Sequence, residues 1–182
     1  METNAKIKQA DIANLRLIRY PDPRLREVST PVDEIDDDVR RLVEKMFEIL
    51  FAAPGVGLAA VQAGVPVRLF VACPTGDPKD RRVYVNPRIV SEDGSQEEDE
   101  GCLSVPGITT RIKRRNVVTI RAVGLDGKEF EETGEGLLAR LFQHETDHLN
   151  GRLILDRMGS LARLANRRLI KELEDKFAEG TA

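Results

Sequence analysis

The sequence predicts an α+β fold in which a mainly antiparallel β-sheet packs around a central helix, with an N-terminal helix before it and a C-terminal helix after it. Apolar residues recur at helical spacing in three segments, near residues 39–50, 136–149 and 159–177. Short runs rich in β-branched residues lie between the first two of these segments. The order helix, strands, helix, helix favours α+β over alternating β-α units.

The first predicted helix has one apolar face. Its apolar residues fall at i, i+3, i+4, i+7, i+8 and i+11: Val39, Leu42, Val43, Met46, Phe47 and Leu50. Asp36 suits the N-cap position, and the acidic residues after it suit the positive end of the helix dipole. Pro54 and Gly55 then end the helix.

The middle of the chain is predicted to form loops and strands. A Gly/Ala-rich loop over residues 55–64 is followed by strands near residues 67–72, 83–86, 89–90, 117–123 and 128–132. Leu125-Asp126-Gly127 favours a hairpin turn between the last two, and alternation turns Val118, Ile120 and Ala122 to the core. The acidic runs at residues 33–38 and 92–100 are expected to be solvated faces or loops.

Two helices are predicted in the last third of the chain. The first covers about residues 136–149 and ends at Asn150-Gly151, a strong stop signal. The second covers about residues 159–177. Its predicted apolar stripe is Leu161, Ala165, Leu169, Leu173 and Phe177.

Composition narrows the class of protein. The chain has 182 residues, 41% hydrophobic and 32% charged, which fits a single domain over residues 1–182. The net charge of -3 and the 4% aromatic content argue against a general nucleic-acid or anionic-membrane surface. With two cysteines and no apolar run of signal-peptide or transmembrane length, we expect a cytoplasmic protein without a disulfide framework.

The only two histidines of the chain are four residues apart, at His144 and His148, with Glu145 directly after the first. On a helix, residues i and i+4 share a face, so both imidazoles can bind one metal ion. Glu145 lies about 100° around the helix, where it can act as a general base on a water molecule without being a ligand. Two buried imidazoles without a ligand would be costly, which favours a metal site over a purely structural pair.

The residues alone leave the third metal ligand open. A catalytic site usually has three protein ligands and an open position. Ile154 stands where one group of metalloproteases has a further histidine, while another group takes a glutamate from a later helix, for which Glu172 and Glu174 are candidates. The thiolates of Cys73 and Cys102 would suit zinc or ferrous iron.

Three separated segments resemble the peptide deformylases. They occur in the family's order at residues 55–62 (GVGLAAVQ), 100–104 (EGCLS) and 143–149 (QHETDHL). The resemblance covers about residues 12–175, the core of the expected catalytic domain. It implies that Cys102, His144 and His148 bind one divalent metal ion, with Fe2+ the metal in vivo and Zn2+, Ni2+ or Co2+ able to replace it.

The resemblance also implies a reaction and roles for further residues. The family hydrolyses the formyl group from N-terminal formyl-methionine of new peptides and releases formate. Glu145 would accept and return the proton, while the Gln62 side-chain amide and the Leu103 backbone N–H would stabilise the oxyanion. Glu100 is expected to pair with Arg114 beside the metal.

The methionine side chain of such a substrate needs an apolar pocket. Val56, Leu137 and Phe142 are candidate walls, although core packing is the commoner role of such residues, and Gly57 lets the backbone approach the substrate closely. Arg140 stands one turn before His144, where many relatives have an aliphatic residue. Its stem could line the pocket while its head meets Glu98 or solvent.

Other interpretations stay open at the level of sequence. A zinc endopeptidase would need a different third ligand, and a metal-stabilised binding module would have a closed coordination shell. A cysteine protease using Cys102 and His144 would leave His148 and Glu145 without a role. Cys73 follows a strand and is expected in the core. The basic last helix could contact the ribosome transiently, as in some relatives, or could simply be solvated.

Overall fold

The structure is a computed structural model that describes residues 4–180, so the ends of the predicted domain, residues 1–3 and 181–182, lie outside the described part. The helices are α1 (Ala5–Lys8), α2 (Asp37–Phe51), α3 (Leu137–Leu149), α4 (Ile154–Arg157), α5 (Ser160–Ala165) and α6 (Arg167–Ala178). The strands are β1 (Gly57–Ala59), β2 (Leu69–Ala72), β3 (Arg82–Asp93), β4 (Gln96–Cys102), β5 (Val105–Arg114), β6 (Val117–Val123) and β7 (Glu129–Glu135). Within residues 4–180, no helix combines the length and the apolar character needed to span a membrane.

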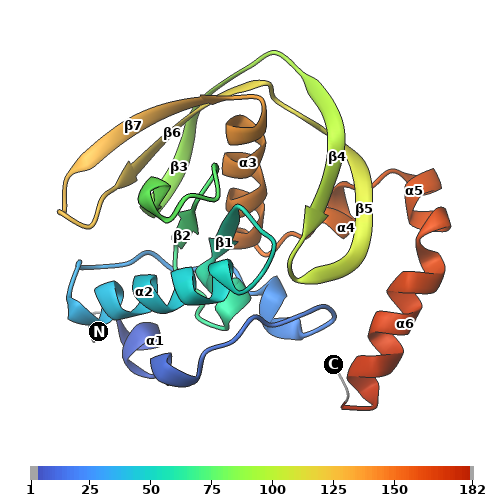
Figure 1. Cartoon of the computed structure of the whole chain (residues 1–182), viewed down its shortest axis with the longest axis horizontal. Coiled ribbons are helices and arrows are strands. Elements are labelled where there is room, and N and C mark those ends of the chain that lie inside the picture. The colour runs from blue at the N-terminus through green and yellow to red at the C-terminus, as the bar shows by residue number, and fades with distance from the viewer. Residues whose placement is uncertain (1–3, 181–182) are drawn as a thin grey trace.

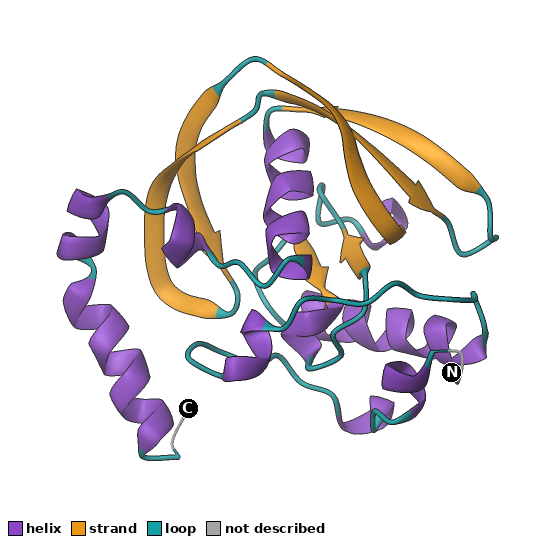
Figure 2. Cartoon of the chain, turned by 180° about the vertical axis from the view of Figure 1, so that it is seen from behind, coloured by secondary structure: helices purple, strands orange, loops and turns teal. Residues whose placement is uncertain are grey.

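Two antiparallel sheets flank the central helix α3. Strands β1-β2-β3-β6-β7 form a five-stranded sheet in that order, and β4 and β5 form a separate two-stranded hairpin. Figure 1 shows α3 between them, with the larger sheet on one side and the hairpin on the other, and Figure 2 shows the same arrangement from behind. The helix is therefore positioned by two independent β structures.

The larger sheet is buried on both faces at β2. Leu69 and Val71 pack into the cluster that holds the apolar face of α2, whereas Phe70 and Ala72 pack into the cluster that holds α3. Successive side chains of a strand point to opposite faces, so a fully apolar strand can hold a helix on each side. Helix α3 therefore packs on an apolar face of the sheet that is itself supported by α2 from the other side.

Helix α3 has two chemically different faces. The face toward the sheet is apolar, with Ala139, Phe142 and Leu149 packed in one cluster with Phe70 and Tyr84. The face toward the hairpin is polar, and its residues follow at helical spacing: Arg140, His144, Asp147 and His148. Burial of the apolar face holds α3 in place, so its polar face is available to form a functional site.

Several predictions of local structure are confirmed. The predicted first helix is α2, and Asp36 caps it through an Oδ1 that accepts from the Val39 backbone N–H at 2.9 Å. The predicted strand at residues 117–123 is β6, with Val118, Ile120 and Ala122 buried. The predicted central helix over residues 136–149 is α3.

The predictions for the middle of the chain need correction. The loop predicted over residues 55–64 contains strand β1 and a 3-10 turn, and the two strands predicted at 83–86 and 89–90 are one bulged strand, β3. The acidic run 92–100, predicted to be a solvated face or a loop, ends β3 and forms much of β4, so the loop is wrong but the solvated face is confirmed for most of the run. Its side chains at Glu97, Glu98 and Asp99 are exposed, but Glu100 is buried. Pairing with β5 overrides the low strand propensity of these acidic residues.

The prediction of a single C-terminal helix over residues 159–177 is also wrong. The chain forms two helices, α5 and α6, that meet at Asn166. On the predicted stripe, Leu161 is 82% exposed, but Leu173 is half-buried and packs as predicted. Ile170, which lies off that stripe, is buried in the same cluster with residues of β5. The break changes which face of the segment meets the body, and Figure 1 shows α6 at the edge of the molecule.

The turn after α3 provides a test of backbone constraint. Gly151 has φ +70°, and an added Cβ would lie 2.5 Å from the Arg26 carbonyl oxygen, whereas Gly127 has φ +77° and open space around it. Gly127→Ala should lower the free energy of unfolding by about 1 kcal/mol, the cost of the left-handed conformation. Gly151→Ala should lower it by about 3 kcal/mol, because the clash adds to that cost. Denaturant unfolding measures both, and equal losses would contradict the predicted clash.

Candidate metal centre and active site

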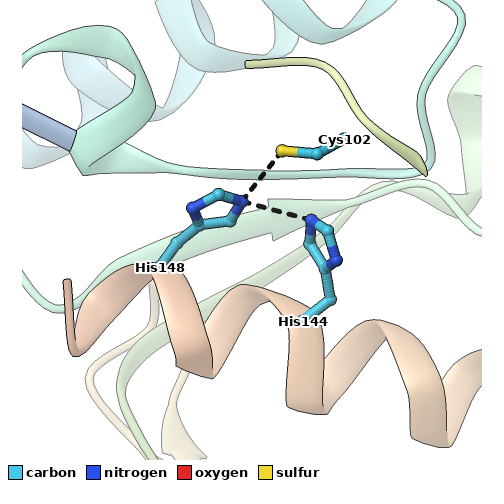
Figure 3. A group of neighbouring side chains, drawn as sticks. All are labelled: Cys102, His144 and His148. Carbon is cyan, nitrogen blue, oxygen red and sulfur yellow. Dashed lines mark hydrogen bonds between the residues drawn. The ribbon is translucent and has the colours of Figure 1, made fainter. Parts of the chain in front are cut away.

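Three side chains that could hold a metal ion converge on one point. The ligand atoms of Cys102, His144 and His148 all lie within 4.8 Å of one another. His148 Nε2 is 3.3 Å from Cys102 Sγ and 3.1 Å from His144 Nε2. Figure 3 shows the two imidazoles rising from neighbouring turns of α3 toward the sulfur.

The elements explain this convergence. His144 and His148 are one helical turn apart on α3, so their side chains share its polar face. Cys102 is the last residue of β4, where the register with β5 shifts between Gly101 and Cys102. Such a register shift re-aims a side chain out of the regular strand pattern. The hairpin therefore presents the sulfur to the helix.

The donor set fits a divalent cation. A thiolate and two imidazoles suit zinc and ferrous iron alike. His144 Nδ1 lies 2.6 Å from Glu100 Oε1, which leaves its Nε2 facing the other two donors. Burial lowers the pKa of His148 well below its ordinary value, so this imidazole is neutral and able to bind a metal.

Glu100 connects the candidate metal centre to a buried ionic network. Its Oε1 accepts from Arg114 Nη2 at 2.6 Å and its Oε2 accepts from Arg114 Nε at 3.1 Å, in addition to the contact with His144. Burial would raise the pKa of this carboxyl, but the hydrogen bonds from His144 and Arg114 outweigh burial and hold the pKa well below its usual range. Glu100 is therefore an anion at neutral pH.

The network continues on the far side of Arg114. Arg114 Nη1 donates to Asp147 Oδ2 at 2.6 Å, and Arg157 Nε donates to the same oxygen at 3.0 Å. Asp147 lies on α3 between the two histidines, and Arg157 ends α4. The ion pairs thus hold the hairpin, the central helix and α4 around the ligand set.

Glu145 lies beside the candidate metal site. Its side chain is buried, and its Oε2 has no hydrogen-bond partner among residues 4–180. Burial raises the pKa of this carboxyl to about 7. A Cβ on Gly57 would lie 2.5 Å from Glu145 Oε1, so the glycine makes room for the carboxylate. A buried carboxyl that titrates near neutral pH can both accept and donate a proton.

The Gln62 amide is fixed by three neighbours. Its Oε1 accepts from the Ala59 backbone N–H at 2.8 Å, and its Nε2 donates to Ser104 Oγ at 3.1 Å and lies 3.8 Å from Cys102 Sγ. These contacts orient the N–H group toward the metal centre. Leu103 lies between Cys102 and Ser104 in the turn of the hairpin, on the same side of the site.

A cavity of about 530 Å³ opens beside these groups. Gln62, Cys102, Leu103, His144 and Glu145 line one part of it. The predicted pocket residues Val56, Gly57, Leu137 and Arg140 also line it. Phe142 does not, because it packs in the core against Tyr84.

The expected placement of the Arg140 head group is wrong. Within residues 4–180 its guanidinium makes no hydrogen bond to Glu98 and is not solvated, because the residue is only 5% exposed, and it donates to Glu100 Oε2 at 2.8 Å. A buried carboxylate is a stronger partner for arginine than an exposed one, because water does not screen the interaction. The expected position of Cys73 is confirmed, since it is buried in the core.

The sequence patterns assigned no role at the metal site to Ser104, Asp147 or Arg157, and Arg157 was predicted only as part of the basic C-terminal face. Ser104 lies inside one of the three matching segments and Asp147 lies inside the H-E-x-x-H helix. These positions could have indicated that both residues lie near the site. Arg157 carried no such signal, because its contact with Asp147 comes from the packing of α4 against α3. Both Ser104 and Asp147 are buried polar residues, which require partners.

Comparison with known proteins gives a consistent result. The sequence model of the polypeptide deformylase family matches residues 14–164. The peptide deformylase of Pseudomonas aeruginosa is 46% identical over 170 residues, which cover 92% of this chain and 99% of that protein. A crystal structure of a peptide deformylase from Legionella pneumophila superposes with a TM-score of 0.83 at 45% identity and covers 89% of this chain and 96% of that one. The crystal structure of the plant peptide deformylase PDF1B superposes with a TM-score of 0.88 at 38% identity. The match covers 92% of this chain and 93% of that chain.

The fold and the site define a hydrolase with a candidate metal centre on an H-E-x-x-H helix. The comparisons narrow this class. The chain belongs to the polypeptide deformylase family and is an enzyme of that family.

The ionic network predicts that Glu100 supports metal binding. Glu100→Gln keeps the size of the side chain but removes the charge that His144, Arg114 and Arg140 share. We expect the dissociation constant for zinc to rise about 10–100-fold. The melting temperature should also fall, because buried Arg140 loses its anionic partner and Arg114 keeps only Asp147.

Competition with a chelator measures the zinc affinity, and calorimetry measures the melting temperature. Glu98→Gln is the matched control, because Glu98 lies on the same strand and is exposed. A Glu100→Gln protein that keeps both wild-type values would contradict this role.

Proposed function

We propose that this enzyme is a metal-dependent peptide deformylase that hydrolyses the formyl group from N-terminal formyl-methionine of newly made peptides and releases formate. The observation that carries the proposal is the convergence of Cys102, His144 and His148 beside the buried carboxyl of Glu145, at the wall of a cavity. The family membership of the chain supports the same reaction.

Cys102, His144 and His148 would hold one divalent cation, with Fe2+ as the metal in vivo and Zn2+, Ni2+ or Co2+ as possible replacements. When bound, such an ion polarises a carbonyl group and lowers the pKa of water. The thiolate and imidazole donors suit each of these metals better than they suit magnesium or calcium. Metal analysis of protein purified without oxygen would identify the native ion.

Glu145 serves as the general base and then as the general acid. Its carboxylate accepts a proton as water adds to the formyl carbon, and it returns the proton to the amine nitrogen as the C–N bond breaks. The products are formate and a free amino terminus. A pKa of about 7 suits both steps at neutral pH.

Gln62 and Leu103 stabilise the oxyanion that develops on the formyl oxygen. The Gln62 Nε2 group is held by contacts of its amide to Ala59 and Ser104, so it needs no reorientation during the reaction. The Leu103 backbone N–H would supply the second donor from the hairpin turn. Loss of one such donor typically lowers kcat by about 10²–10³.

The cavity receives the methionine side chain and the peptide that follows it. Val56 and Leu137 are partly exposed apolar residues at its wall, where they can bury an unbranched apolar side chain. Gly57 keeps the wall beside Glu145 free of a side chain. We take residues 1–182 as one catalytic domain, which the matched span of residues 14–164 supports.

Two further proposals concern the setting of the enzyme. Its substrate would place it in the cytoplasm, where new chains are made. The exposed basic residues of α5 and α6 would make transient contact with the ribosome, through Arg163, Arg167, Arg168 and Lys171. Several of these charges are already paired, as in Arg168 with Glu172, so we expect a weak contact. Co-sedimentation with ribosomes, with and without reversal of these charges, tests it.

Formate release from formyl-Met-Ala-Ser tests the proposed reaction. We expect the wild-type enzyme to release formate, and we expect Glu145→Ala to lower kcat/KM at least about 10²-fold with unchanged metal content, because proton transfer is lost while the ligands stay. Glu48→Ala, at an exposed glutamate of α2, is the control and should keep full activity.

Other outcomes separate the remaining interpretations. Cleavage of internal peptide bonds without formate release would identify an endopeptidase instead. Metal binding without any hydrolysis would indicate a binding module with a closed coordination shell. A Glu145→Ala protein with full metal content and full activity would contradict the assigned mechanism.

A further inference from the structure

We propose that Arg140 is a positioning residue with two separable parts: a guanidinium that holds Glu100 and the ligand-bearing hairpin in place, and a methylene stem that forms a wall of the substrate cavity. The second part rests on the proposed function, whereas the first concerns metal binding alone.

The guanidinium of Arg140 joins α3 to both strands of the hairpin. Its Nη1 donates to Glu100 Oε2 on β4 at 2.8 Å and to the Ile112 carbonyl on β5 at 3.1 Å. Its Nη2 donates to Gln96 Oε1 at the start of β4 at 3.3 Å. Because β4 carries Cys102 and α3 carries both histidines, these bonds tie the third ligand to the other two.

Arg140 also contributes to how the two oxygens of Glu100 are partnered. Oε2 accepts from Arg140 Nη1 and from Arg114 Nε, while Oε1 faces His144 Nδ1 and Arg114 Nη2. Arg114 bridges both oxygens and Arg140 adds a second donor to Oε2, which together restrict rotation of the carboxylate. Oε1 is thereby held 2.6 Å from His144 Nδ1, which orients the imidazole toward the metal centre.

The balance of charges around Glu100 and Asp147 also supports a positioning role for Arg140. Glu100 and Asp147 are both nearly inaccessible to solvent, and Arg114 lies between them. Arg157 compensates Asp147, although its side chain is 39% exposed. Arg140 supplies the second buried cation, on the Glu100 side. Without it, the anion next to the metal ligands would share a single guanidinium with Asp147.

The stem of Arg140 has a different neighbourhood from its head. Arg140 lines the cavity together with Leu137, Leu141 and His144, which stand within one turn of it on α3. Because Glu100, Ile112 and Gln96 hold the head of Arg140, we assign the aliphatic stem to the cavity wall. The charge of Arg140 is paired with Glu100 in the cluster and is not presented to a bound side chain.

Three variants separate these two parts. Arg140→Met keeps an unbranched stem and removes the donors, Arg140→Ala removes both, and Arg140→Lys keeps a cation without the planar fork. Arg111→Met is the matched control, because Arg111 is an exposed arginine of β5 that donates to the Glu97 carbonyl. The measurements are zinc affinity by chelator competition, and kcat and KM for formyl-Met-Ala-Ser.

Arg140→Met should weaken zinc binding about 10-fold and leave KM within about twofold of wild type. Arg140→Ala should weaken zinc binding to the same extent and also raise KM about 10-fold, because apolar contact with the substrate is lost. Arg140→Lys should restore part of the zinc affinity. Arg111→Met should match wild type throughout.

Wild-type zinc affinity in Arg140→Met would overturn the positioning role. Equal KM values in Arg140→Met and Arg140→Ala would overturn the role of the stem. If Arg140→Met does not fold, the comparison of Arg140→Lys with wild type decides the first part, since equal zinc affinity would contradict it. Absence of formate release by the wild-type enzyme would refute the proposed function, while the zinc measurements would still test the guanidinium.

Discussion

The site depends on one buried carboxylate, Glu100, and on the cations that compensate it. A lone carboxylate at this depth would be strongly destabilising. Here it accepts from two arginines and faces His144, so each of its oxygens is satisfied. The same bonds join the β4–β5 hairpin, which carries Cys102, to α3, which carries both histidines. Removal of the anion would therefore affect the packing of the hairpin and the geometry of the ligands together.

The two faces of α3 have different roles, since one packs against the sheet and the other carries the polar residues of the site. The apolar face packs on a sheet whose strand β2 is buried on both sides, and it fixes the helix by hydrophobic burial. The opposite face carries the candidate ligands and the ion pairs, and it meets the cavity where α3 contacts the hairpin. Rigid support behind a polar face keeps the site preorganised, so that binding a metal or a substrate need not order the chain first.

The sequence correctly predicted those features of the fold that depend on local periodicity or on a short motif. The helical spacing in α2 and α3 and the alternation in β6 each depend on neighbouring residues, and so does the shared face of His144 and His148. The hairpin was missed because its acidic strand has low intrinsic strand propensity and forms only by pairing with β5. The contacts of Arg140 with Glu100 and of Arg157 with Asp147 join residues from different elements, and no local pattern encodes them. Cys102 could be assigned only through the family resemblance.

The central claim is that Cys102, His144 and His148 together hold one metal ion. The absorption spectrum of the cobalt-loaded protein tests it most directly, because a thiolate bound to Co2+ gives a sulfur-to-metal charge-transfer band. The account predicts this band in the wild type and in Cys73→Ser, since Cys73 is buried elsewhere with its Sγ 3.1 Å from the Asp77 carbonyl oxygen. It predicts loss of the band in Cys102→Ser. A band that survives in Cys102→Ser would contradict the account.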